Sequence, residues 1–117
     1  MIRQNNDSGS IVIEKNVYTD IAGVAASNCF GVKGMAARSV SDGLVHLLRR
    51  ESMRKGVRVE FHEDSTISSD LHIMVDHGVN LSTVGESIIS EVRYVVNKCT
   101  GTTVRAVNVY IDSMMIG

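Results

Sequence analysis

The chain has 117 residues, a length that fits one domain; its 44% hydrophobic and 21% charged residues exclude wholesale disorder. Lys and Arg total 12 and Asp and Glu total 13, so the net charge of -1 argues against a protein built to coat nucleic acid. Residues 1–9 are polar and no apolar run approaches the ~20 residues of a membrane helix, so we expect a cytoplasmic protein that reaches a membrane only through a partner.

The N-terminal residues are expected to lie outside the folded domain. Residues 1–8 are polar and are predicted to be a flexible leader, followed by a single domain at 9–117. The apolar run within 10–14 is typical of a short strand.

The next segment has a helical period. We expect a helix over 16–28 with one apolar face, because these residues recur at helical spacing: Val17, Ile21, Val24, Ala25 and Asn28. Gly31 is expected to end this helix, because glycine adopts the left-handed cap conformation at low cost.

Residues 32–38 form a weak strand pattern interrupted by Gly34. The conformation of residues 39–55 is left open, although leucines within 44–48 suggest a short helical turn before a basic stretch at 49–55.

Two alternating segments follow and predict a hairpin. The strands are expected at 57–62 and 71–77, joined by a polar connection at 64–69. The side chains expected to face the core are Val57, Val59, Phe61, Leu71, Ile73 and Val75. Those expected on the opposite face are Arg58, Glu60, His62, His72, Met74 and Asp76.

A second amphipathic helix is predicted from about Ser82, with Thr83-x-x-Glu86 as a capping box and Gly101 as the C-terminal cap. The last strand is predicted at 104–112, with alternating apolar residues inward and Asn108 and Tyr110 outward.

These elements give the order β-α-β-β-β-α-β. Each helix and each main strand has one apolar face, which predicts an α+β domain with two helices packed on one face of a small, largely antiparallel sheet. The other face is left to solvent or to a partner.

The same segments resemble a known family. The blocks are Gly9-Ser10-Ile11-Val12-Ile13, Ile21-Ala22-Gly23-Val24-Ala25, Gly31-Val32-Lys33-Gly34-Met35, Lys55-Gly56-Val57-Arg58-Val59, Val75-Asp76-His77-Gly78-Val79-Asn80-Leu81 and Thr100-Gly101-Thr102-Thr103-Val104-Arg105-Ala106-Val107-Asn108-Val109. In this order they resemble the successive blocks of the alkaline shock protein 23 family, over about residues 9–112.

The resemblance implies a small non-enzymatic protein of Gram-positive bacteria, linked to cell-envelope or alkaline stress. The chain is similar to the short, housekeeping-type members. Partners implied by the resemblance are a second copy of the chain, a small membrane anchor protein or a dihydroxyacetone-kinase-like protein. The family provides no catalytic residues to carry over.

Candidate chemistry is sparse. His62 and His72 would be cross-strand neighbours if the hairpin paired in register, and Asp76 shares their face, but no HxH, HxxxH or HExxH spacing supports a metal site. We therefore interpret these three residues as solvated and predict no metal site and no catalytic residue. The glycine-rich phosphate-binding motifs are also missing, so we predict no cofactor. Cys29 and Cys99 are expected to be reduced thiols.

An alternative function is a small nucleic-acid-binding module. Gly31-Val32-Lys33-Gly34 matches the GxxG pattern that clamps a nucleic-acid backbone in KH domains, and the basic stretch at 49–55 could add phosphate contacts.

The favoured function is a scaffold or adaptor that acts through protein–protein interaction. The candidate partner surface is the polar sheet face with the Met-rich tail: Arg58, Glu60, His62, His72, Met74, Asn108, Tyr110, Met114 and Met115. An extension of the last strand packed on its own domain is the other interpretation of the tail.

Overall fold

The computed structural model describes residues 1–35 and 56–115. Its elements are β1 (Ile2–Asn6), β2 (Gly9–Ile13), α1 (Lys15–Ser27), β3 (Val32–Met35), β4 (Val57–Phe61), β5 (Ile67–Asp76), α3 (Leu81–Thr100) and β6 (Val104–Met115). The α+β class is confirmed, and the predicted order is found with one further strand, β1, at its start. The interpretation of residues 39–55 lies outside the described residues.

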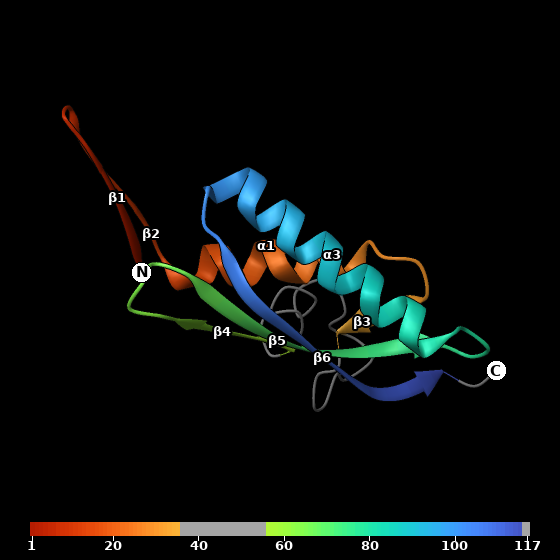
Figure 1. Ribbon diagram of the computed structural model, residues 1–117. Helices are drawn as coiled ribbons and strands as arrows, with labels where there is room; N and C mark the ends of the chain where they lie inside the picture. Colours follow the sequence, from red (N-terminus) through yellow and green to blue (C-terminus); the bar gives the residue numbers. More distant parts are fainter. Residues whose placement is uncertain (36–55, 116–117) are drawn as a thin grey trace, which may run out of the picture.

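Strand β5 is the centre of the main sheet (Figure 1). It pairs antiparallel with β4 through its first half and with β3 through its second half. Its other edge pairs with β6, and this pairing is parallel. The parallel direction follows from α3, because a helical crossover between two strands returns the chain in the same direction.

Helices α1 and α3 lie side by side on one face of the sheet, as predicted (Figure 1). Alternate residues of β5, such as Leu71 and Ile73, are fully buried against Ile88 and Val92 of α3. Each such side chain contributes roughly 1.5–3 kcal/mol by leaving water. The helices therefore cover one face of β5, and its other side chains point to the opposite face.

Helix α1 buries a face that overlaps the predicted one only in part: Ile21 and Ala25 pack in the core as predicted. Val17 and Val24 are 44% and 49% exposed, whereas Tyr18 and Ala22 are buried. The alanines allow α1 to lie close on the sheet, and the Tyr18 hydroxyl, buried with its ring, is 2.8 Å from the Thr102 hydroxyl. The close packing of the alanines and this internal hydrogen bond determine which side of α1 faces the sheet.

The start of α3 also differs from its prediction. The N-cap is Asn80, whose side-chain oxygen accepts a hydrogen bond of 3.0 Å from the backbone N–H of Thr83. The predicted capping box of Thr83 and Glu86 is wrong, because both residues lie inside the helix. Gly101 is confirmed as the left-handed C-terminal cap, with φ 74°.

The hairpin of β4 and β5 has a shorter connection than the predicted 64–69. His62 N–H donates to the Thr66 carbonyl at 2.9 Å, and β5 already begins at Ile67, which pairs with Phe61. Ile67 is 1% exposed, so burial of this side chain favours the early start.

Residues 1–8, the expected leader, contain β1, which pairs antiparallel with β2 from Ile2 opposite Ile13. This hairpin extends away from the helices and the main sheet (Figure 1). Its base is held by buried Ile2 and by Gln4, whose side-chain amide donates to the Thr100 carbonyl at 2.6 Å. No helix in the described part of the chain is long and apolar enough to span a membrane.

Candidate functional site

The outer sheet face consists of the β4, β5 and β6 side chains that point away from α1 and α3. The register places Asp70 opposite both Arg58 and Asn108, and His72 opposite Tyr110. Predicted partner-surface residues on this face are Arg58, Glu60, His72, Met74, Asn108 and Tyr110, and His62 lies at its edge beside Ser68. Arg58, Glu60, Asn108 and Tyr110 are exposed, and the other three are half-buried.

The centre of the outer sheet face is an ordered cluster of three side chains. The rings of His72 and Tyr110 stack with centroids 4.7 Å apart and planes 12° from parallel. The same imidazole places Nδ1 3.0 Å from Oδ2 of Asp112. Stacking of this kind stabilises a pair by about 0.5–1.5 kcal/mol, and the exposed contact between the imidazole and the carboxylate adds at most about 1 kcal/mol. The cluster thus holds an aromatic surface in one orientation while Tyr110 remains 46% exposed.

Next to this cluster, polar side chains bridge β5 and β6. The Asn108 amide donates to Oδ1 of Asp70 at 2.9 Å. Farther along, Lys33 of β3 forms an ion pair with Asp76 at 3.3 Å. These cross-strand contacts arrange the face without burying it.

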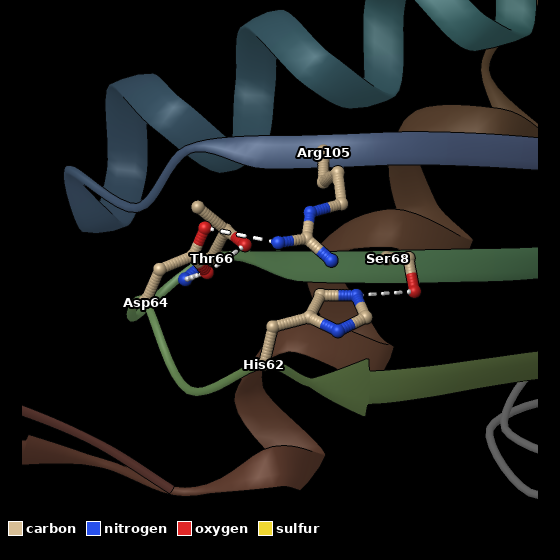
Figure 2. A network of polar contacts seen from close by, with 5 residues as sticks. All are labelled: His62, Asp64, Thr66, Ser68 and Arg105. Atoms are coloured by element: carbon tan, nitrogen blue, oxygen red, sulfur yellow. Dashed lines mark hydrogen bonds and ion pairs between the residues drawn. The ribbon is translucent and has the colours of Figure 1, made fainter.

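The end of the outer sheet face is a polar network around the β4–β5 turn (Figure 2). Arg105 Nη2 donates to Oδ2 of Asp64 at 3.0 Å, and the backbone and hydroxyl of Thr66 donate to Oδ1. The Thr66 hydroxyl, followed by the other donors, holds the pKa of Asp64 below its usual value. Beside it, His62 Nε2 lies 3.0 Å from the Ser68 hydroxyl.

The methionine tail is a continuation of β6, and a bulge divides its side chains between two faces. The register shifts between Ile73 and Met74, after which Met114 lies opposite Val75 and Met115 opposite Asp76. Val75 is buried on the helix side and Asp76 belongs to the outer sheet face, so only Met115 joins the predicted surface. For residues 113–115, the interpretation of the tail as a strand extension is confirmed.

The register that would make His62 and His72 cross-strand neighbours is not the one in the structure. The register that pairs Phe61 with Ile67 puts His62 at the turn, next to Ser68, and His72 at the other end of β4. Within residues 1–35 and 56–115, no three His, Cys, Asp or Glu side chains are grouped as metal ligands.

The Gly31–Gly34 segment does not form a loop between two helices. Val32–Met35 is strand β3, and Gly31 is a buried turn residue with φ 87°, three residues after the α1 C-cap at Asn28. Gly31 therefore does not cap the helix as predicted; it allows close approach to Val84. The nucleic-acid alternative has no support here, and the basic stretch 49–55 lies outside the described residues.

Cys29 lines an open groove of about 580 Å³ between the end of α1 and α3, together with Phe30 and Glu91. Burial, and secondarily the Glu91 carboxylate, raise the pKa of the Cys29 thiol. A thiol that is held protonated is a poor nucleophile, so this groove lacks an activated cysteine.

A second groove, of about 390 Å³, lies between α3 and β6 and was not predicted from the sequence. Its apolar lining includes Leu81, Ile89, Val109 and Ile111. The sequence signal was the spacing of Leu81, Gly85 and Ile89 along one side of α3, where glycine leaves space that a larger residue would fill.

The chain is thus a two-layer α+β domain with an ordered polar sheet face. The model of the alkaline shock protein 23 family, described as having a cell envelope-related function, matches residues 3–116. The chain belongs to this family.

Relatives of known sequence agree with this placement. The chain is 36% identical to the uncharacterized protein YloU of Bacillus subtilis (strain 168), over 92% of this chain and 90% of the relative. It is 33% identical to the uncharacterized protein Spy1614 of Streptococcus pyogenes serotype M6, over 98% and 95%. Among solved structures, the copper form of the MamM CTD has a TM-score of 0.53 at 17% identity, covering 88% of this chain and 89% of that one. At this identity the likeness shows a shared fold only.

Proposed function

We propose that the protein is a non-enzymatic scaffold or adaptor that binds protein partners in the cell-envelope or alkaline-stress context. The outer sheet face is the surface that we assign to this binding. The observation that supports it is the cluster of His72, Tyr110 and Asp112, which is ordered by its own contacts and still exposed.

An aromatic ring held in one orientation loses little conformational entropy when a partner covers it, which favours Tyr110 as an anchor. Met74 and Met115 lie on the same face and provide adaptable apolar contacts. No described helix or strand packs over this face, since α1 and α3 lie on the other one (Figure 1).

The partners proposed from the family resemblance are a second copy of the chain, a small membrane anchor protein and a dihydroxyacetone-kinase-like protein. A cytoplasmic location with indirect membrane association is part of the same proposal. The near-neutral net charge of -1 supports protein partners over nucleic acid.

Co-purification from the native cell tests this function. Tagged wild-type protein is expected to retain a specific partner that the Tyr110→Ala variant loses. Tyr94→Ala is the matched control, because Tyr94 is an exposed tyrosine of α3 in the other layer. Equal recovery of the partner by the two variants would show that Tyr110 is not part of the binding surface. The absence of any specific partner would contradict the scaffold function.

A further inference from the structure

Strand β6 has a free edge in the described structure. Ile67 N–H donates to the Thr103 carbonyl, so odd-numbered residues of β5 direct their backbone groups toward β6. The β6 residues opposite them, Val107, Val109 and Ile111, therefore direct their own N–H and C=O groups away from β5. No described strand pairs with that side of β6.

An uncovered strand edge is a template for another strand, and folded proteins usually block it. Among residues 1–35 and 56–115, the contact that covers this edge is at the beginning of β6, where Arg93 Nη2 donates to the Arg105 carbonyl at 2.7 Å. Beyond this contact, the edge from Val107 to Ile111 carries no charged side chain and no proline.

The free edge runs beside the groove between α3 and β6. Val109 and Ile111 line this groove from the strand, and Leu81 and Ile89 line it from the helix. At Gly85 a Cβ would meet no atom within 4 Å, so the groove is open at its centre. A strand added to β6 would place every second side chain in this apolar space.

The charge at the groove indicates which kind of peptide segment can bind there. Glu86 lines the groove with an exposed carboxylate that forms no ion pair with any residue in 1–35 or 56–115. A basic side chain on the added strand would complement this carboxylate.

We infer that the β6 edge and the α3–β6 groove together bind an extended segment of a partner protein by strand addition. The segment has apolar side chains at alternate positions and a basic residue that reaches Glu86. The backbone of Val107, Val109 and Ile111 provides hydrogen bonds, and the groove provides the preference for side chains. The groove and the β6 backbone edge, not the outer side chains, provide these contacts, so the inference does not depend on the function proposed for the outer sheet face.

The test uses the full chain and a set of short capped peptides that alternate Val, Ile, Leu or Phe with Thr and contain one Lys. Binding is followed by amide NMR and by fluorescence anisotropy. We expect the peptides to shift the amides of Val107, Val109 and Ile111 and to slow their hydrogen exchange. Two versions of the best peptide are N-methylated at complementary alternate residues, and we expect only one of them to lose binding, because only one set of amides faces β6.

The Gly85→Leu variant fills the groove where space is open and is expected to weaken peptide binding on the order of tenfold. Ser90→Leu, at an exposed position of α3 outside this groove, is the matched control and should bind like wild type. Both variants are checked for a urea midpoint that is not lower than that of the wild type, since replacing a glycine inside a helix can raise it.

Three results would overturn the proposal. They are no amide shift with any peptide of the set at millimolar concentration, equal binding of the two N-methylated peptides, and unweakened binding to Gly85→Leu. Because Tyr110→Ala alters the opposite face, loss of a cellular partner in that variant with intact peptide binding separates the two surfaces.

Discussion

Replacing Gly31 with alanine tests whether this glycine is needed for packing. Gly31 has φ 87°, and a Cβ there would lie 3.0 Å from Cγ2 of Val84 and 3.2 Å from Cγ1 of Val79. The left-handed conformation costs an alanine roughly 1–2 kcal/mol. Val84 is 3% exposed and cannot move freely, so overpacking adds about 1–3 kcal/mol. The Gly31→Ala variant is expected to lose about 2–5 kcal/mol of unfolding free energy.

Gly78→Ala is the matched control for this change. Gly78 has the same φ of 87°, but a Cβ there would meet nothing within 4 Å. Its loss should be only the conformational cost of about 1–2 kcal/mol. Urea unfolding followed by circular dichroism measures both variants. If Gly31→Ala is no less stable than Gly78→Ala, the close approach of the turn before β3 to α3 is refuted.

Two further predictions follow from the pKa directions. Cys29 should react with iodoacetamide more slowly than exposed Cys99 at mildly alkaline pH, because the Cys29 thiol is partly buried and its pKa is raised by burial and by Glu91. Peptide mass spectrometry over time measures the two alkylation rates, and equal rates would contradict the prediction. Thr66→Ala should raise the pKa of Asp64 toward its ordinary value, as read by carbon NMR titration, because the Thr66 hydroxyl is the main cause of the lowered pKa; an unchanged titration would contradict it.

The sign of the Asp64 effect on stability follows from its lowered pKa. The folded state binds the proton less readily than the unfolded state, so the carboxylate favours folding above the unfolded-state pKa. This contribution is lost as the pH falls through the lower folded-state pKa. In Thr66→Ala the acid-induced loss should therefore be smaller than in wild type.

Strand faces were predictable because a period of two is unambiguous when one face is buried. In β4 and β5, Val57, Val59, Leu71 and Ile73 are buried as expected. Hairpin register was not predictable, because polar Ser68 and Ser69 read as a connection although Ser69 is buried in β5. Because β5 starts earlier than the sequence suggested, His62 and His72 are not cross-strand neighbours.

The face of α1 could not be chosen from its own sequence. Val17, Ile21 and Val24 form one apolar stripe, and Tyr18 and Ala22 belong to another. Both satisfy a helical period, and the choice depends on the close approach that alanine permits and on a hydrogen-bond partner distant in sequence. Tertiary contacts of this kind leave no local signal.

The candidate surface was predictable in part. Outward positions such as Arg58, Asn108 and Tyr110 followed from alternation. Met114 and Met115 are assigned to opposite faces because of a bulge, and no residue type in β6 predicts that bulge. The groove between α3 and β6 depends on the pairing of two elements and became visible only in the fold.

Site-specific photocrosslinking in the native cell tests the central claim most directly. The photoreactive residue p-benzoylphenylalanine is placed at Tyr110 in one strain and at Tyr94 in a matched strain, both being exposed tyrosine positions on opposite layers. The scaffold function on the outer sheet face predicts a discrete protein adduct from position 110 and none from position 94. Adducts of equal yield from both positions, or no protein adduct from position 110, would contradict it.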